Sequence, residues 1–149
     1  MNIEFRKKQD PEIIQYLKNV PLFSALNDKT IKAIIRDSRE VNYPSGKVIL
    51  REGEQSVVFH VILSGGVEIV KKGKHLSQLG SGEFFGEMGL FTGEARSADV
   101  IAIEPTRCLA LTAWSFRSFL RHNPSIAFEV IRTLALRLSE KDSIKAQTG

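Results

Sequence analysis

Hydrophobic residues recur at helical spacing over the first forty residues of the chain. Pro11 follows Asp10 and leads into the apolar run IIQYL, which is typical of a cap followed by the first residue of a helix. Pro21 then interrupts the pattern. A second helix, capped by Asn27 or Asp28, is predicted from the recurrence of Leu26, Ile31, Ile34 and Ile35. We therefore expect residues 1–38 to be a helical segment.

From Arg39 the pattern changes to short runs rich in Val, Ile and Phe that are separated by turns. The predicted strands are VILR, VVFHVILS, VEIVKK and HLSQL, followed after a gap by ADVIAIE and RCLAL. Of the 11 glycines, ten fall between Gly46 and Gly93, and most of them coincide with these turns. Short strands with turns about every ten residues indicate a sandwich or barrel over residues 39–112.

Helical spacing returns after Leu111, and residues 113–149 are predicted to form C-terminal helices and a tail. The run AWSFRSFL ends at the Asn123-Pro124 break, and Ser125 opens a longer helix. One apolar face of that helix is expected to comprise Ala127, Val130, Ile131, Leu134 and Leu138. Such a face serves equally well for packing within the chain and for contact with a second subunit.

Composition restricts the class of protein without identifying it. With 149 residues, 42% of them hydrophobic and 26% charged, the chain has the size and balance of one globular domain. The net charge of +4 is too small to establish polyanion binding. No apolar run approaches the roughly 18 residues that a membrane span requires, so a cytoplasmic location and no membrane contact are expected.

The residues that commonly bind metals or form disulfides are few and scattered. Cys108 is the single cysteine and lies in an apolar run, so we expect a core residue and no disulfide. The histidines, His60, His75 and His122, are far apart and form no ligand motif. No metal-ligating residue is predicted.

The segment 84–98 contains residue types that a simple strand connection does not need. A short helical turn at Gly86-Glu87-Met88-Gly89 would direct backbone N–H groups toward an anion. Arg96, flanked by small residues, would bind a phosphate through its planar, permanently charged guanidinium group. Glu87 would then face sugar hydroxyl donors, because a phosphate would repel it. The alternative is a surface loop in which Glu87 and Arg96 pair with each other or with water.

The sequence FGEMGLFTGEARSADV resembles the phosphate-binding cassette of the cyclic nucleotide-binding domain family. The resemblance extends from VPLFSAL at Val20 to FRSFLRHNP and the following helix. It implies that Glu87 binds the ribose 2′-hydroxyl and that Arg96 binds the cyclic phosphate. The predicted ligand-binding residues are Gly86, Glu87, Met88, Gly89, Arg96, Ser97 and Ala98, with no catalytic residue.

The same resemblance implies a mainly β fold with flanking helices. This is an antiparallel β-roll of the double-stranded β-helix or jelly-roll type, with N-terminal and C-terminal helices and the nucleotide inside the roll. A residue of the C-terminal helix, by position Arg137 or Lys141, is expected to cover the base. We expect cyclic AMP rather than cyclic GMP as the ligand, and no cofactor.

Two functional hypotheses remain open at this point. The first is a sensor domain, either standing alone or forming part of a Crp-type transcriptional regulator, with a possible homodimer through the C-terminal helix. No enzyme is expected, because no acidic pair with metal spacing and no activated nucleophile is visible. The 25 residues after Pro124 leave no room for a helix-turn-helix, so no nucleic-acid contact is expected. The second hypothesis is a degenerate roll that binds no nucleotide and acts in dimerisation or protein docking.

Overall fold

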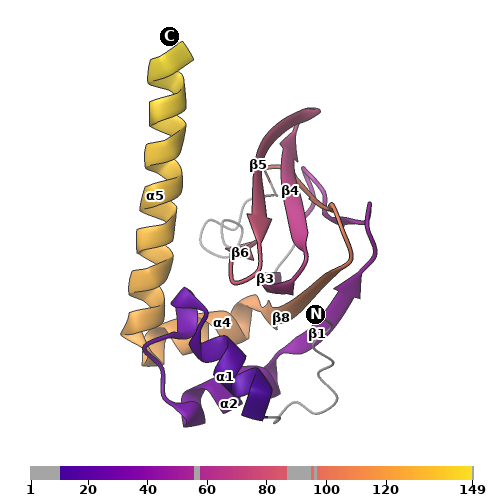
Figure 1. Cartoon of the computed structure of the whole chain (residues 1–149). Helices are drawn as coiled ribbons and strands as arrows, with labels where there is room; N and C mark the ends of the chain where they lie inside the picture. Colours follow the sequence, from indigo (N-terminus) through magenta and orange to yellow (C-terminus); the bar gives the residue numbers. More distant parts are fainter. Residues whose placement is uncertain (1–10, 56–57, 87–94, 96, 149) are drawn as a thin grey trace.

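Two four-stranded antiparallel sheets, with helices before and after them, make up the fold (Figure 1). It is seen in a computed structural model that describes residues 11–55, 58–86, 95 and 97–148, with side chains described up to residue 139. The N-terminal elements are α1 (Pro11–Lys18), the 3-10 turn η1 (Pro21–Phe23) and α2 (Asp28–Asp37). The strands are β1 (Arg39–Tyr43), β2 (Val48–Leu50), β3 (Val58–Ser64), β4 (Gly66–Lys71), β5 (Lys74–Gly80), β6 (Phe84–Phe85), β7 (Asp99–Ala102) and β8 (Thr106–Thr112). The C-terminal helices are α4 (Ala113–His122) and α5 (Pro124–Thr148).

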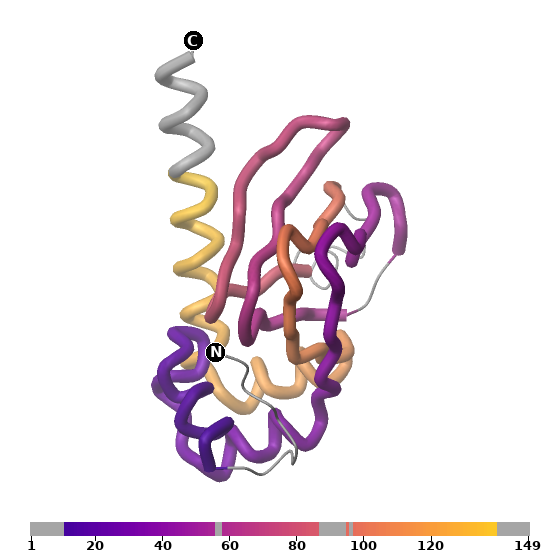
Figure 2. Tube along the Cα trace, turned by 45° about the vertical axis from the view of Figure 1, so that its right-hand side comes forward, coloured from indigo at the N-terminus to yellow at the C-terminus, as the bar shows by residue number. Residues whose placement is uncertain are grey.

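The strand order defines the roll. One sheet has the order β1-β8-β3-β6 and the other the order β2-β7-β4-β5, and every pairing is antiparallel. The tube view shows the strands forming the roll, with the helices gathered at one end and along one side (Figure 2). The predicted antiparallel β-roll with flanking helices is confirmed.

Strand β3 is buried on both faces, and this explains its continuous apolar sequence. Successive side chains of a strand point to opposite faces of the sheet. Phe59, Val61 and Leu63 join the core that contains the helices, whereas Ile62 joins the core between the two sheets. Strand β8 divides its side chains in the same way. The sheet β1-β8-β3-β6 therefore separates a helical core from the interior of the roll.

The helical core is held by aromatic stacking and by ties between helices and strands. Phe59 of β3 stacks on Phe116 of α4, with ring centroids 3.9 Å apart and an interplanar angle of 15°. Tyr16 of α1 donates a hydrogen bond to the carbonyl of Leu63. Asn27 caps α2 as expected, because its Oδ1 accepts from the Thr30 N–H at 2.9 Å. The helices are thus fixed against one face of the sheet.

Gly65 forms the corner at which the chain passes from one sheet to the other. Its φ of 90° lies in the left-handed region, and an added Cβ would lie 2.4 Å from the carbonyl oxygen of Pro105. The buried Thr106 secures the same corner, since its hydroxyl lies 3.0 Å from the carbonyl oxygen of Gly66 and 3.2 Å from its N–H. Two of the crossings between the sheets, β3 to β4 and β7 to β8, therefore pack against each other at this corner.

The structure differs from the sequence-based expectation at α5 and at β1. Val130 is buried and Leu134 packs on the helical core, but Ile131 and Leu138 are 64% and 62% exposed, so the five expected residues do not form one buried face. The buried face is rotated toward Ile126, which is fully buried. The hydrophobic pattern also predicted no strand before Val48. Strand β1 has the largely polar sequence REVNY, and it forms a strand through its pairing with β8.

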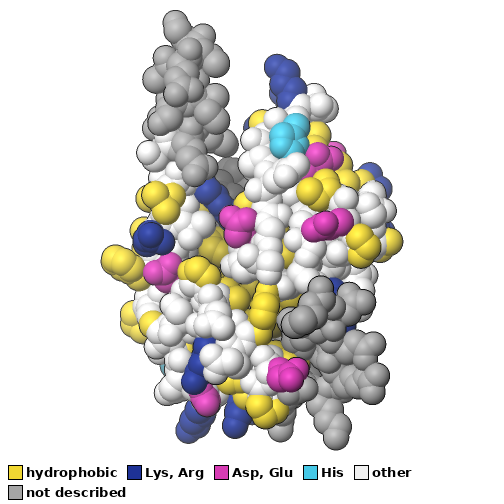
Figure 3. All heavy atoms as spheres, in the orientation of Figure 1, with side chains coloured by type: hydrophobic (Ala, Val, Ile, Leu, Met, Phe, Trp, Pro, Cys, Tyr) yellow, Lys and Arg dark blue, Asp and Glu magenta, His cyan; other side chains and the backbone are white. Residues whose placement is uncertain are grey.

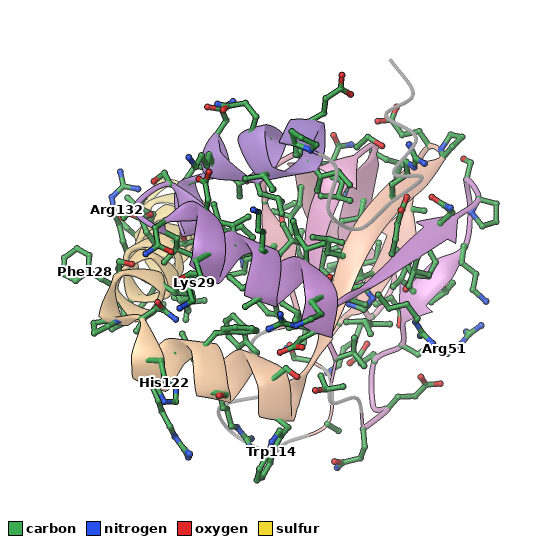
Figure 4. The ribbon with its side chains drawn as sticks, turned by 90° about the horizontal axis from the view of Figure 1, so that it is seen from below. Lys29, Arg51, Trp114, His122, Phe128 and Arg132 are labelled. Carbon is green, nitrogen blue, oxygen red and sulfur yellow. The ribbon has the colours of Figure 1, made fainter. Side chains whose placement is uncertain are left out.

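We expect Phe116→Ala to lower the free energy of unfolding by about 3–5 kcal/mol, because a fully buried ring would leave a cavity. The matched control on the same helix is Trp114→Ala, whose side chain is 82% exposed and points outward in Figure 4. Trp114→Ala should change the free energy of unfolding by no more than about 0.5 kcal/mol. Urea unfolding of both variants measures the difference, and equal losses would contradict the proposed stacked core.

Candidate functional site

The segment predicted to bind a ligand is described at its two ends. Gly86, Ser97 and Ala98 lie among the described residues. Glu87, Met88, Gly89 and Arg96 lie outside them, so their predicted roles stay predictions. The described part of the site therefore comprises the strands that hold the two ends of the segment and the interior between the sheets.

Gly86 begins the segment at the end of β6. Its φ of 91° lies in the left-handed region, which glycine adopts without steric cost. The two preceding residues are buried and point to opposite faces, because Phe84 belongs to the helical core and Phe85 to the roll interior. Pairing of Phe84 with Val61 and of Phe85 with His60 anchors β6 on β3. The start of the segment is thus attached to the sheet that carries the helices.

Ser97 and Ala98 end the segment where it enters β7 of the other sheet. Ser97 is exposed and Ala98 is half-buried. The next residue, Asp99, accepts a hydrogen bond from the Glu52 N–H at 2.7 Å, and β7 pairs with both β2 and β4. Since β6 and β7 belong to different sheets, residues 86–98 connect one sheet of the roll with the other.

The interior between the sheets is apolar. Its buried residues are Leu50, Ile62, Val67, Phe85, Val100 and Cys108. Tyr43, Ile49, Ile69 and Leu79 are partly buried around them. Side chains of this kind commonly line the sites at which proteins bind the uncharged rings of small molecules.

His60 and Tyr43 add polar atoms to this interior. The His60 side chain is 3% exposed, its Nε2 lies 2.9 Å from the Tyr43 hydroxyl, and its ring stacks on Phe85 with centroids 4.7 Å apart. The sequence left open whether His60 is a core or a surface residue. Strand parity could have placed it, because His60 alternates with Phe59 and Val61, which face the helices. His60 thus supports, through Phe85, the residue that precedes Gly86.

Burial raises the pKa of one ionisable group on β1 and of one on β8. Burial, with a smaller contribution from Cys108, raises the pKa of the Tyr43 hydroxyl above its usual value, and Arg39 partly opposes this shift. Burial alone raises the pKa of the Cys108 thiol to about 12. Cys108 is fully buried, as expected of a core cysteine. Neither group carries charge at neutral pH.

Arg137 of α5, one of the two residues expected to cover a base, contacts β6. Its Nη2 donates a hydrogen bond to the carbonyl oxygen of Phe84 at 2.8 Å, and its guanidinium carbon lies 4.8 Å from the centroid of the Phe84 ring. Lys141 lies in the part of α5 whose side chains are outside the described set. The structure thus brings Arg137 to the strand that leads into the predicted segment.

Neither a metal cluster nor a membrane-spanning helix is found in the part of the chain that the structure describes. Within the described ranges, no three His, Cys, Asp or Glu side chains are grouped so that they could hold a metal ion. None of the helices found there has the length and apolar character needed to span a membrane.

Two antiparallel sheets around an apolar interior, with helices packed on one of them, define a β-roll domain of the jelly-roll type. Residues 40–123 match the family model described as "Cyclic nucleotide-binding domain". The chain therefore belongs to the cyclic nucleotide-binding domain family, as its resemblance to the cassette indicated. Domains of this family are regulatory and generally non-enzymatic, although relatives carry them within channels and enzymes.

Similar proteins place the domain in several contexts. The "Cyclic AMP receptor protein" of Thermus thermophilus is 32% identical over 131 residues, which cover 85% of this chain and 61% of the relative. A cyclic nucleotide-gated potassium channel of Rhizobium etli is 37% identical over 133 residues, which cover 89% of this chain and 37% of the relative. The chain thus spans less than two thirds of both relatives.

Solved structures agree with the fold. The crystal structure of the Thermus thermophilus catabolite activator protein has a TM-score of 0.75 and 32% identity, and the match covers 86% of this chain and 62% of the other. The cAMP-bound structure of PfPKA-R has a TM-score of 0.82 at 20% identity, covering 93% of this chain and 48% of the other, and supports the fold alone.

We expect Cys108 to resist alkylation by iodoacetamide at pH 8 in the folded protein. A pKa raised from 9.0 to about 12 lowers the thiolate fraction roughly a thousandfold, and the thiolate is the reactive form. Mass spectrometry of samples treated with and without denaturant measures the effect. Rapid alkylation of folded protein would show that the thiol is accessible and ionised.

Proposed function

We propose that this chain is a sensor domain that binds a cyclic nucleotide within the roll, with cyclic AMP preferred over cyclic GMP. The observation that carries the proposal is the order of residues in FGEMGLFTGEARSADV, which lies between two strands of opposite sheets. Membership of the cyclic nucleotide-binding domain family supports it. The name of the Thermus relative, a cyclic AMP receptor protein, favours cyclic AMP.

In this proposal the charged half of the ligand is bound by the segment 84–98. Arg96 pairs with the cyclic phosphate, because its planar fork donates two parallel hydrogen bonds. Gly86 and Gly89 allow backbone N–H groups to approach the phosphate closely, and Met88 belongs to the same turn. Ser97 adds a hydroxyl beside a small neighbour, Ala98. Glu87 accepts from the ribose 2′-hydroxyl and is kept away from the phosphate.

The base and the apolar edge of the ribose pack in the roll interior, which is lined by the residues around Phe85 and Val100. The signal is carried by α5, with Arg137 or Lys141 covering the base. Shifting the ratio of closed to open domains from 1:99 to 99:1 requires the ligand to bind the closed state about 5.5 kcal/mol more tightly than the open state. Binding of the nucleotide must therefore favour one position of α5 by several hydrogen bonds or by substantial apolar burial.

The downstream partner is an effector domain or protein that responds to α5. We propose that the domain serves as the sensor part of a Crp-type regulator or as a stand-alone sensor, by analogy with the Thermus relative. Contact with nucleic acid by these residues is not part of the proposal.

We expect Arg96→Ala to weaken cyclic AMP binding by roughly 2–5 kcal/mol, because a largely buried phosphate would lose its charged partner. This loss is about tens to thousands-fold in Kd. Lys29→Ala is the matched control, since Lys29 is exposed on α2 and Figure 4 shows it among the N-terminal helices. Titration calorimetry measures all three proteins, and equal affinities of wild type and Arg96→Ala would reject the site.

The same titrations compare the nucleotides and test the alternative function. Wild type is expected to bind cyclic AMP more tightly than cyclic GMP. If wild type binds neither nucleotide at millimolar concentration, the sensor proposal is wrong. The result would then favour the alternative function, a roll that acts in dimerisation or protein docking.

A second copy of the chain is the proposed partner of the outer surface of α5. Phe128, Ile131 and Leu138 are 69%, 64% and 62% exposed. Figure 3 shows hydrophobic side chains along this outer side of α5, and Figure 4 shows Phe128 projecting from the helix. Burying these side chains against their counterparts would remove apolar surface from water on both copies. The continuous α5 helix suits such a symmetric contact.

We expect sedimentation to show a dimer of the wild-type chain and a monomer after Ile131→Glu combined with Leu138→Glu, because buried charges at the contact would be unpaired. Leu76→Glu is the control, as Leu76 is 45% exposed on β5 and lies outside the proposed contact. A wild-type chain that sediments as a monomer with and without cyclic AMP would contradict the proposed dimer.

A further inference from the structure

One side chain of α5 makes two kinds of contact with a single residue of β6. The Nη2 of Arg137 donates to the carbonyl oxygen of Phe84 at 2.8 Å, within the range of charge-assisted hydrogen bonds. The guanidinium carbon of the same residue lies 4.8 Å from the centroid of the Phe84 ring, which is cation–π geometry. Both partners belong to the chain itself, so the contact ties two of its elements together.

The residue that Arg137 contacts is firmly held. Phe84 is 4% exposed, and its ring lies 5.4 Å from that of Phe59, which in turn stacks on Phe116 of α4. Its backbone pairs with Val61 of β3. Two residues later comes Gly86, where the chain turns into the predicted phosphate-binding segment. Arg137 therefore contacts the firmly held residue that lies two positions before the start of that segment.

The position of Arg137 follows from the helical repeat of α5. Ile126, Val130 and Leu134 pack inward, and residue 137 continues this face at helical spacing. The neighbours of Arg137 on either side, Leu136 and Leu138, are 51% and 62% exposed. Figures 1 and 2 both show α5 starting at the end of the molecule where the other helices lie and running from there along the side of the roll that contains β5. Arg137 thus extends the buried face of α5 from the helical core to the roll.

We propose that Arg137 is a positioning residue that ties α5 to β6, so that the position of α5 and the position of the strand that leads into Gly86 are coupled. A shift of β6 on ligand binding changes the distance between the Phe84 carbonyl and the guanidinium group, and a shift of α5 acts on β6 in return. Such coupling is reciprocal in binding free energy. The tie is a property of the chain, and only its response to a nucleotide rests on the proposed function.

The position of α5 is measured by electron spin resonance distances between labels at Ser139→Cys and Lys74→Cys, in the full chain without nucleotide. Cys108 takes no label, because it is buried and its thiol is neutral. Arg137→Met keeps much of the stem of the side chain and removes its charge and donors. It is expected to lower the ratio of docked to undocked α5 by roughly tenfold or more, the range for hydrogen bonds to charged groups.

Three further variants separate the tie from general destabilisation. Arg132→Met on the same helix is the matched control, because Arg132 is exposed and its contact is an ion pair with Glu129 at 3.8 Å. Arg137→Lys keeps the charge but not the fork and should retain part of the docked population. Phe84→Leu keeps the carbonyl and removes the ring, so it should give an intermediate distance distribution. These two variants also test the tie if Arg137→Met does not fold.

Cyclic AMP titration of the same proteins tests the coupling. Arg137→Met should weaken binding by about the factor by which it lowers the docked population, while Arg132→Met should leave both unchanged. If wild type binds no cyclic AMP but Arg137→Met still releases α5, the proposed function fails and the tie stands. Identical distance distributions for wild type, Arg137→Met and Arg132→Met would overturn the tie, whatever the nucleotide does.

Discussion

The fold depends on strands β3, β6 and β8 of one sheet being buried on both faces. On one face, Phe59, Val61 and Leu63 complete a core with all the helices, and on the other Ile62 completes the interior of the roll. The two cores are not independent of each other, because the same strands supply side chains to both. A displacement of β3 or of its edge neighbour β6 is therefore felt by the helices and by the roll interior together.

This shared sheet gives a physical route from a ligand to the helices. Residues Phe84 and Phe85 of β6 are adjacent in sequence, yet the first packs with Phe59 and the second with His60. The segment from Gly86 onward thus starts from a strand with one side chain in each core. Arg137 adds a direct contact from α5 to the same strand. We propose that β6 and α5 are the two elements of this domain that move together when a nucleotide binds.

Electrostatics divides the proposed site into an uncharged and a charged part. Cys108 and Tyr43 are protonated at neutral pH, and burial raises the pKa of each further, so neither adds charge to the interior. A phosphate would be costly there without a partner. The residues suited to bind it, Arg96 and the glycines around Glu87, belong instead to the segment that joins the two sheets. Apolar burial and charge recognition are thereby assigned to different parts of the chain.

The sequence by itself determined the type and approximate extent of most elements, because periodicity and turn residues are local properties. It also identified the family, since the order of residues from Phe85 to Val100 is specific without any coordinates. The capping of α2 by Asn27 and the burial of Cys108 followed from the same local reasoning.

Only the tertiary structure decided which apolar face of α5 is buried, that REVNY forms a strand, and that His60 faces the roll interior. These outcomes depend on which elements pack together. An apolar helix such as α5 offers more than one face, and the choice between Ile131 and Ile126 is made by the sheet and helices it meets. The contact of Arg137 with Phe84 spans 53 positions, and no local pattern of charge or hydrophobicity encodes it.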